Sequence, residues 1–169
     1  MERDIRMYFI NEIKRIKDSN SNNIAMFIDM DGVVADYRFG EGKNIENNTP
    51  GTYLNKRPIM TTINILKEVS DSFNFDMYIL SSCRHDEQVI EKSIWLDKYM
   101  PFICKKNRLI VISNTFEDRK MLKINKIREL MNKKYDKVIM IDDTHDILFL
   151  AIKEFGDKVI PYHVITLFD

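Results

Sequence analysis

Five short apolar runs, separated by longer segments with helical periodicity, constrain the fold of this 169-residue chain more than any other feature. The runs are rich in isoleucine, valine and methionine, and they read IAMFID, DMYILSS, RLIVIS, KVIMIDD and KVIPYHVITLF. We expect each run to form a buried strand, and the last to form one or two short strands. Buried strands that alternate with amphipathic helices are typical of a parallel sheet covered on both faces. The pattern predicts a single α/β domain over residues 1–169.

The segments between these runs have the apolar spacing of helices. Residues 1–20 are expected to form an N-terminal helix, and a second helix is expected over RPIMTTINILKEVSDSF, where Pro58 lies near the start and is tolerated. Residues 37–57 are the exception, because they are polar, rich in Gly and Asn, and lack a clear period. A loop of this length in a compact α/β chain is more often functional than idle. We therefore expect a short cap insertion after the first strand.

The charge balance and the cysteines exclude several classes of protein. Lys plus Arg and Asp plus Glu each number 26, so the formal net charge is zero, which counts against general binding to nucleic acid or to a membrane. Cys83 and Cys104 are the two cysteines of the sequence and form no CxxC motif, so a reducing, intracellular setting is the default. The N-terminal segment lacks the apolar core of a signal peptide, and no stretch is apolar enough to span a bilayer. We expect a cytoplasmic protein.

Polar side chains follow four of the expected strands at the point where each strand ends. They supply carboxylates, hydroxyls and an amide, with a lysine beyond the third strand: Asp29, Asp31, Ser81, Ser82, Ser113, Asn114, Lys120, Asp142 and Asp143. In open parallel sheets, ligands bind beyond the carboxyl ends of the strands, near the place where strand order reverses. We therefore expect these side chains to form one composite site.

The residue types at this expected site point to phosphate chemistry. Two acidic pairs in a partly dehydrated cleft need either raised pKa values or a cation. Oxygen ligands without a His/Cys cluster suit a hard cation, and a few carboxylates with a substrate oxygen suit Mg²⁺. A serine hydroxyl and a lysine would then face an anionic group, for which phosphate is the obvious candidate. One aspartate would be free to attack phosphorus, and its neighbour to carry the leaving-group proton.

Three of these motifs resemble those of a known family. DMDGVVAD resembles the DxDGxxxD signature of the haloacid dehalogenase (HAD) superfamily of phosphatases, YILSS resembles its second motif, and VIMIDD resembles its acidic fourth motif. The order and spacing agree over residues 24–150. Within the superfamily, the sequence is most similar to the 5′(3′)-deoxyribonucleotidase-like branch, also in TPGTYLNKRPIMTTINIL and IEKSIWLDKYMPF. The resemblance implies a three-layer Rossmann-like HAD core with a central parallel sheet of about five strands.

The resemblance also implies roles for the four aspartates. Asp29 would be the nucleophile that forms an aspartyl-phosphate, and Asp31 would be the general acid/base. Mg²⁺ would be held by Asp29, by the backbone carbonyl of Asp31 and by Asp143, with Asp142 in support. The cofactor expected for this chain is therefore Mg²⁺.

The resemblance further implies how the phosphoryl group is held. Ser81 and Lys120 would contact its oxygens, and Ser82 would offer its backbone amide. Ser81 and Ser82 compete for the hydroxyl contact, and the register within the motif favours Ser81. Lys120 competes with other lysines of a lysine-rich region, which are Lys105, Lys106 and Lys123.

The substrate is the least constrained part of the prediction. Tyr37 stands where the nucleotidase relatives carry an aromatic that contacts the base, and Arg84 borders the expected cleft. We expect a small phosphomonoester, with a (deoxy)nucleoside monophosphate as the first guess, although the short cap leaves base specificity open. The alternatives are a HAD-type phosphotransferase or mutase and a catalytically silent, phosphate-binding regulatory relative. Neither a membrane nor nucleic acid is an expected partner, and a homodimer remains open.

Overall fold

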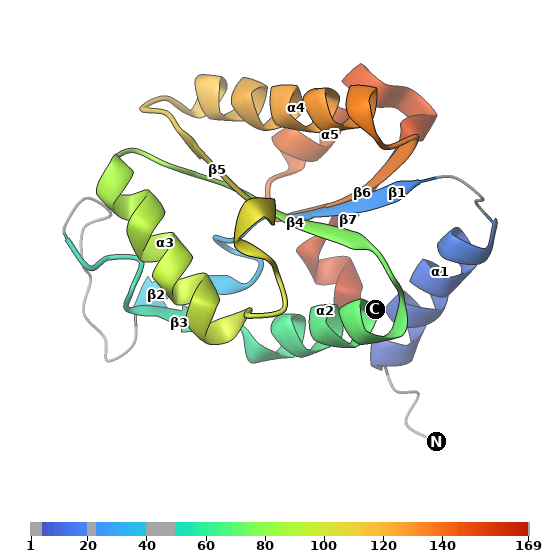
Figure 1. The fold of residues 1–169 in the computed structure, drawn as a ribbon, viewed down its shortest axis with the longest axis horizontal. Helices are drawn as coiled ribbons and strands as arrows, with labels where there is room; N and C mark the ends of the chain where they lie inside the picture. The colour runs from blue at the N-terminus through green and yellow to red at the C-terminus, as the bar shows by residue number, and fades with distance from the viewer. Residues whose placement is uncertain (1–4, 20–22, 40–49, 169) are drawn as a thin grey trace.

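A computed structural model describes residues 5–19, 23–39 and 50–168, and the fold is given for these ranges (Figure 1). Within them, the core is a parallel sheet of five strands in the order β5-β4-β1-β6-β7. The strands are β1 (Ile24–Ile28), β4 (Asp76–Cys83), β5 (Arg108–Ile112), β6 (Lys137–Asp142) and β7 (Val159–His163). Each of the five expected apolar runs therefore contains one strand of this sheet, which confirms the predicted fold class.

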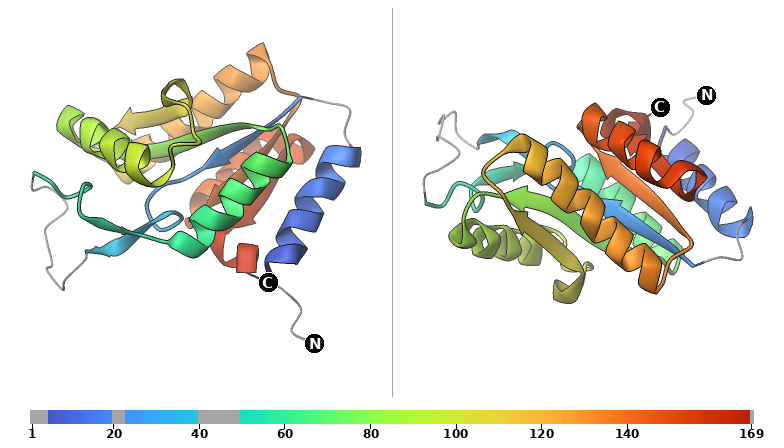
Figure 2. Two further views of the ribbon diagram at one scale, coloured as in Figure 1. Left: turned by 60° about the horizontal axis from the view of Figure 1, so that its bottom comes forward. Right: turned by 90° about the horizontal axis from the view of Figure 1, so that it is seen from above.

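Helices cover both faces of the sheet, as the alternating pattern predicts (Figures 1 and 2). The helices α1, α2 and α3 lie on one face, and α4 and α5 lie side by side on the other. Their bounds are α1 (Ile5–Ser19), α2 (Met60–Ser72), α3 (Asp86–Tyr99), α4 (Phe116–Lys133) and α5 (His145–Phe155). Short 3₁₀ turns occupy η2 (Lys105–Asn107), η3 (Gly156–Lys158) and η4 (Val164–Phe168).

The central strand β1 is buried along its whole length because both of its faces are covered. Its side chains alternate between two apolar clusters, as the two-residue period of a strand requires. Met26 and Ile28 belong to the cluster beneath α1, α2 and α3, whereas Ala25 and Phe27 belong to the cluster beneath α4 and α5. The continuous apolar run of β1 is therefore the consequence of a two-sided core.

Two local expectations differ from the structure. The segment 37–57 contains more than a loop, since β2 (Ala35–Phe39) pairs antiparallel with β3 (Lys56–Pro58). Residues 40–49 of the segment lie outside the described residues. Pro58 ends β3 rather than opening α2. The last apolar run, expected to form one or two strands, forms the single strand β7 followed by the turn η4.

The described part of the insertion is attached to α3. The backbone amides of Gly51 and Tyr53 donate to the two carboxylate oxygens of Glu91, at 2.5 and 3.0 Å. The indole N–H of Trp95 donates to the backbone carbonyl of Lys56 at 2.9 Å. Because hydrogen bonds to a charged group are stronger than neutral ones, the Glu91 contacts fix the turn before β3. They also set the position of Lys56, whose side chain reaches the sheet edge described below.

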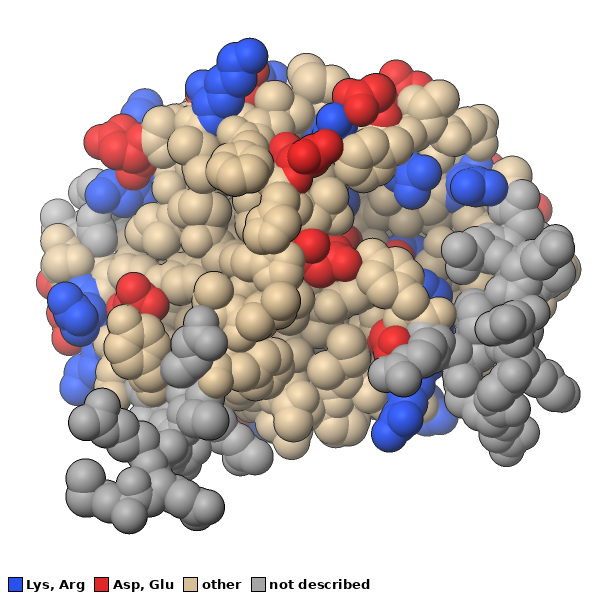
Figure 3. Space-filling model, turned by 180° about the vertical axis from the view of Figure 1, so that it is seen from behind, with Lys and Arg blue, Asp and Glu red and all other residues tan. Residues whose placement is uncertain are grey.

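Charged side chains of both signs are interspersed on the surface seen from behind, in Figure 3, as the zero net charge suggests. Among the described residues, no helix combines the length and the apolar character that crossing a membrane requires.

Candidate active site

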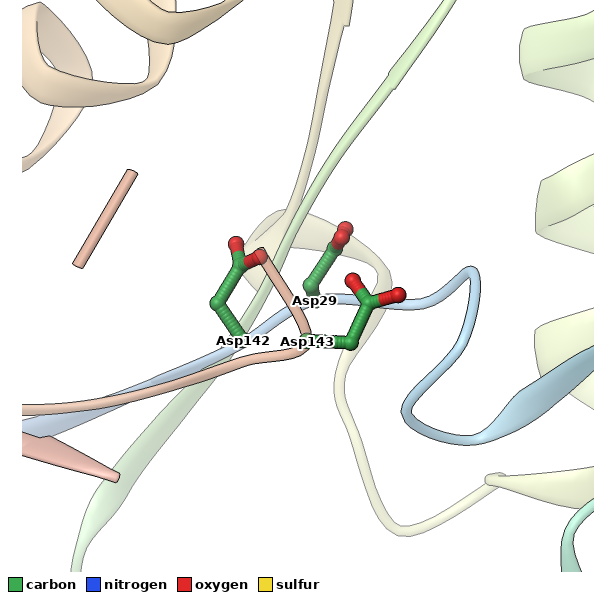
Figure 4. Close-up of side chains that lie close together, drawn as sticks. All are labelled: Asp29, Asp142 and Asp143. Carbon is green, nitrogen blue, oxygen red and sulfur yellow. The ribbon is translucent and has the colours of Figure 1, made fainter. Parts of the chain in front are cut away.

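Three aspartates meet at the carboxyl edge of the sheet, at the point where the strand order reverses. Asp29 follows β1, Asp142 is the last residue of β6, and Asp143 comes next in the chain. Since β1 and β6 are adjacent and parallel, their ends lie side by side. Each aspartate offers one carboxylate oxygen, and these oxygens lie within 4.8 Å of one another (Figure 4). The structure thus brings together carboxylates that are more than 110 residues apart in sequence.

A buried lysine lies between two of these carboxylates. The Lys123 Nζ is 3.0 Å from Asp29 Oδ2 and 3.0 Å from Asp142 Oδ2, and the residue is 2% exposed. Burial alone would lower the pKa of Lys123, but Asp29 and Asp142 outweigh it and raise that pKa above its ordinary value. Lys123 is therefore a permanent ammonium that neutralises one of the site's negative charges.

The lysine beside Asp29 is Lys123, so the prediction that named Lys120 is wrong about which lysine lies there. Helix side chains tilt towards the N-terminus of their helix, and α4 begins at the edge of the sheet that carries the site. Lys123, nearly one turn deeper in α4, therefore reaches the aspartates. Lys120 instead pairs with Glu117 at 2.8 Å and with Asp146 at 3.8 Å.

The acidic cluster suits a hard divalent cation. Three carboxylates and the ammonium of Lys123 leave two negative charges, which is the charge that a divalent cation neutralises. Oxygens on opposite sides of one Mg²⁺ are separated by about 4 Å, which is compatible with oxygens that lie within 4.8 Å of one another. Burial raises the pKa of Asp29 to about 6, with further contributions from Asp142 and Asp31, although Lys123 opposes the shift. Burial also raises the pKa of Asp143. A bound cation would oppose both shifts, because it stabilises the carboxylate form.

A glycine and a tyrosine shape the space around Asp143. Gly32 has a φ of +80°, and a Cβ there would lie 2.1 Å from Asp143 Oδ2 and 2.8 Å from a ring carbon of Tyr37. The Tyr37 hydroxyl donates to Asp143 Oδ2 at 2.8 Å. Glycine is therefore required at position 32 both by the backbone conformation and by the closeness of the carboxylate. Tyr37, predicted to contact substrate, lines the site cavity and orients this aspartate.

Asp31, the predicted general acid/base, is held by two lysines. Its Oδ1 accepts a hydrogen bond from Lys56 Nζ at 2.5 Å, and its Oδ2 accepts one from Lys92 Nζ. Lys92 has no exposed surface and also donates to Ser81 Oγ at 2.8 Å. Burial of Asp31 would raise its pKa, but Lys92 and Lys56 outweigh it and lower that pKa below the ordinary value. Asp31 is therefore a carboxylate in this arrangement.

Asp29, Asp31 and Lys123 border a cavity of about 160 Å³. The described residues that line it are Asp29, Asp31, Tyr37, Tyr53, Lys56, Ser82, Cys83, Arg84, Phe116, Arg119, Lys123, Thr144 and Ile147. Ser82 is on this wall rather than Ser81, because successive side chains of β4 point to opposite faces and Ser81 bonds to Lys92. The Ser81 hydroxyl, predicted to contact the phosphoryl group, is not among the described groups that line the cavity. Ser113 bonds to Thr115 in the turn before α4 instead of facing the cavity.

Sequence reasoning missed Lys56, Lys92 and Arg119, which all belong to this site or its surroundings. A signal for Lys92 exists, because it falls three and four residues before Trp95 and Leu96 on the buried face of α3. A charged residue on the inner face of a helix requires a buried partner. The sequence contains no comparable signal for Lys56, which reaches the site from the insertion, or for Arg119 on the first turns of α4.

Several solved structures share this fold. A chain of the Pnkp1/Rnl/Hen1 RNA repair complex matches with a TM-score of 0.63 at 14% identity, over 85% of this chain and 43% of that chain. A putative haloacid dehalogenase-like hydrolase from Burkholderia xenovorans LB400 matches with a TM-score of 0.51 at 14% identity, over 82% of this chain and 80% of that one. The class C acid phosphatase from Bacillus anthracis, with tungstate bound, matches with a TM-score of 0.58 at 16% identity, over 96% of this chain and 77% of that chain.

These likenesses confirm the expected three-layer Rossmann-like core, and at such identities they concern the fold alone. The chain spans less than half the length of the RNA-repair chain that it matches. None of the three structures is described as a deoxyribonucleotidase, so the nucleotidase-like branch stays a prediction. No family model matches the sequence. A comparison with curated proteins finds no match either.

Proposed function

We propose that this chain is a Mg²⁺-dependent phosphomonoester hydrolase that forms an aspartyl-phosphate on Asp29. One observation carries the proposal: Asp29 lines a cavity beside the Lys123 ammonium, within reach of the acidic pair that follows β6 and two residues before Asp31. A nucleophilic carboxylate, a fixed cation and a second carboxylate on the same cavity wall are the groups that phosphoryl transfer needs.

The reaction proceeds in two displacements. A carboxylate oxygen of Asp29 attacks phosphorus, the bond from phosphorus to the ester oxygen breaks, and the leaving oxygen takes a proton from Asp31. Water then attacks the phosphorus of the aspartyl-phosphate and gives its proton to Asp31 as the bond to Asp29 breaks. Inorganic phosphate leaves, and both aspartates return to their starting forms. Lys123 neutralises charge on the phosphoryl oxygens in both steps.

The acidic cluster supplies the ligands for the metal. Asp29 and Asp143 would hold Mg²⁺ together with the backbone carbonyl of Asp31. Asp142 supports the site, since its own oxygens accept bonds from Lys123 and from the Thr144 amide at 3.0 and 2.9 Å. When bound, Mg²⁺ neutralises the charge that develops on the transferred phosphoryl group.

The lysines on Asp31 favour its carboxylate form, which is the form that accepts the proton of water in the second displacement. The first displacement needs the acid form. Substrate binding must therefore draw Lys56 or Lys92 away from Asp31, and Lys56 is the one that lines the cavity. An anionic substrate supplies a competing partner for that ammonium.

A nucleoside monophosphate is the first substrate to test. Two exposed rings line the cavity, those of Tyr37 (57% exposed) and Phe116 (42% exposed), and they offer faces on which a base can stack. The exposed rim also favours water over a second substrate as the phosphoryl acceptor, so hydrolysis is preferred to a phosphotransferase or mutase reaction. Because a structure of the same fold belongs to an RNA repair complex, a phosphorylated RNA end is included among the substrates.

The test is a panel of phosphomonoesters assayed with Mg²⁺ and with EDTA. The panel contains p-nitrophenyl phosphate, ribo- and deoxynucleoside monophosphates, sugar phosphates and a 3′-phosphorylated RNA. We expect Mg²⁺-dependent release of phosphate by the wild-type chain and a loss of about 10³-fold or more in the Asp29→Asn variant. Asp146→Asn, an exposed aspartate on α5 that does not line the cavity, is the matched control and retains activity. Equal hydrolysis by wild type and Asp29→Asn, or none by either, would overturn the mechanism.

A further inference from the structure

The side of the cavity near Asp31 carries more positive charge than the catalytic carboxylates neutralise. Asp31 is paired with two lysines, although one would balance its charge. Lys92 is completely buried and is also held by Ser81, whereas Lys56 lines the cavity. Lys56 is therefore the surplus ammonium that faces an incoming ligand.

Two arginines add to this surplus. Arg84 and Arg119 line the same cavity, and within the described part of the chain neither forms an ion pair with a carboxylate. Arg119 Nε donates to the backbone carbonyl of Thr115 at 3.2 Å, which fixes the guanidinium at the start of α4. Burial raises the pKa of Tyr53, and Arg119 and Arg84 oppose that rise, which agrees with both guanidinium groups lying near its hydroxyl.

Lys56 lies on the leaving-group side of the reacting phosphorus. Lys123 belongs to the Asp29 side, where the phosphoryl group is transferred. Lys56 belongs to the Asp31 side, because it donates to the carboxylate that protonates the leaving oxygen. A cation there meets the part of the substrate that departs with that oxygen.

The size of the cavity leaves the leaving group at the rim. Its volume of about 160 Å³ is below the roughly 300–1,000 Å³ typical of pockets that enclose a small ligand. A phosphoryl group fits inside, but a nucleoside extends over the rim, where Arg84 and Phe116 are exposed. An extended substrate is therefore compatible with this site.

A charge count reaches the same conclusion. The residues counted are Asp29, Asp31, Asp142 and Asp143 on one side and Lys56, Lys92, Lys123, Arg84 and Arg119 on the other. The second group exceeds the first by one positive charge. A divalent cation adds two, and a phosphomonoester dianion removes two. One positive charge is left, which favours a further negative charge on the substrate, such as that of a phosphodiester or a second phosphate.

We infer that the natural substrate is a phosphomonoester whose leaving group carries a second phosphate, bound by Lys56, Arg84 and Arg119. A nucleoside bisphosphate and the phosphorylated end of an oligonucleotide both have this chemistry. In the oligonucleotide, the adjoining phosphodiester takes the place of the second phosphate. The inference rests on the proposed function, because it assigns the leaving group of that reaction.

The test compares matched substrates on the full chain in the presence of Mg²⁺. Adenosine 3′,5′-bisphosphate is compared with adenosine 3′- and 5′-monophosphates, and a dinucleotide with a terminal 3′-phosphate is the oligonucleotide arm. We expect kcat/KM to be about tenfold or more higher when the second phosphate is present. A stronger preference for the dinucleotide identifies a polymer end as the source, and a stronger preference for the bisphosphate identifies a small molecule.

Variants distinguish a specific second phosphate subsite from a general attraction of anionic substrates by positive charge. Arg84→Gln and Arg119→Gln should each reduce the ratio of bisphosphate to monophosphate kcat/KM towards one. The control is Arg57→Gln, an exposed residue next to Lys56 that does not line the cavity, and it should leave the ratio unchanged. A wild-type ratio near one, or a ratio that neither cavity arginine affects, would overturn the inference while the hydrolase proposal stands.

Measurement of ligand affinity tests the inference even if the chain hydrolyses no phosphomonoester. Calorimetry with the Asp29→Asn protein and Mg²⁺ measures the dissociation constants of the bisphosphate and the monophosphates without catalysis. A tenfold tighter bisphosphate supports the second phosphate subsite even if the reaction class is wrong. Equal dissociation constants overturn the subsite even if the chain proves to be a phosphatase.

Discussion

Gly32 is the position where a single added methyl group should separate the chemistry of the site from the stability of the fold. Its φ of +80° lies in the left-handed region, where a residue with a Cβ costs roughly 1–2 kcal/mol. In addition, the methyl of Gly32→Ala would lie 2.1 Å from Asp143 Oδ2 and 2.6 Å from its Cγ. No real contact is that short, so the carboxylate of Asp143 has to move.

Gly156 provides a matched control. Its φ is +58°, but a Cβ built there meets no heavy atom within 4 Å. Gly156→Ala therefore also places a Cβ at a positive φ, but without the collision. For a domain of this size, 1–2 kcal/mol lowers the melting temperature by roughly 2–8 °C, and we expect both variants to fall in that range.

The two variants should differ in their response to Mg²⁺. A disturbed metal ligand or its support typically costs 10- to 100-fold in metal affinity or activity. We expect Gly32→Ala to need at least about tenfold more Mg²⁺ for half-maximal phosphatase activity, and Gly156→Ala to behave like the wild type. The assay is phosphate release against Mg²⁺ concentration, with melting curves for each protein. If Gly32→Ala matches Gly156→Ala in its Mg²⁺ requirement, the assignment of Asp143 as a metal ligand is refuted.

Three further outcomes test other contacts of the site. Lys123→Met leaves two buried aspartates without their shared ammonium, so the free energy of unfolding in EDTA should fall by about 3–5 kcal/mol. Lys120→Met, the control, should lower it by less than about 1 kcal/mol. Denaturant titrations that show equal losses for the two variants would contradict the pairing. Tyr37→Phe removes the hydroxyl that donates to Asp143 and should raise the half-saturating Mg²⁺ concentration about tenfold in the activity assay, whereas an unchanged titration would rule out an orienting role. The pKa of Asp29 is raised from 3.8 to about 6, so its protonated form stabilises the fold fully below about pH 4, and this contribution is lost as the pH rises through about 6. In EDTA, the free energy of unfolding of the wild type should therefore fall relative to that of Asp29→Asn between about pH 4 and pH 6. A difference between the two proteins that stays constant over this range would exclude the shift.

The acidic part of the site was predictable because it depends on local sequence and on sheet topology. Asp29 and the Asp142–Asp143 pair each follow an apolar run directly, and parallel strands place all their carboxyl ends on one edge. Buried strands of five and six residues leave little freedom in where each strand ends. The positions of these carboxylates therefore follow from the strand assignment alone.

The basic part of the site was harder to predict because it depends on helix rotation and on a segment without periodicity. Lys120 and Lys123 are both on the inner side of α4, and the direction of helix side chains decides which of them reaches Asp29. Lys56 reaches Asp31 because Glu91 and Trp95 hold the backbone of the insertion against α3. No spacing rule relates residues that meet in this way.

The burial of Lys92 is explained by its contacts with Asp31 and Ser81, and the proposed substrate would give this second ammonium a further role. Lys92 has no exposed surface and belongs to the face of α3 that also buries Trp95 and Leu96, where an apolar side chain of similar volume is often neutral or more stabilising. Asp31 needs one counter-charge, and Lys56 already supplies it. Under the proposed function, Lys92 would stay beside Asp31 when Lys56 turns to a phosphate of the substrate, so substrate binding would relieve one of the two contacts that lower the pKa of Asp31.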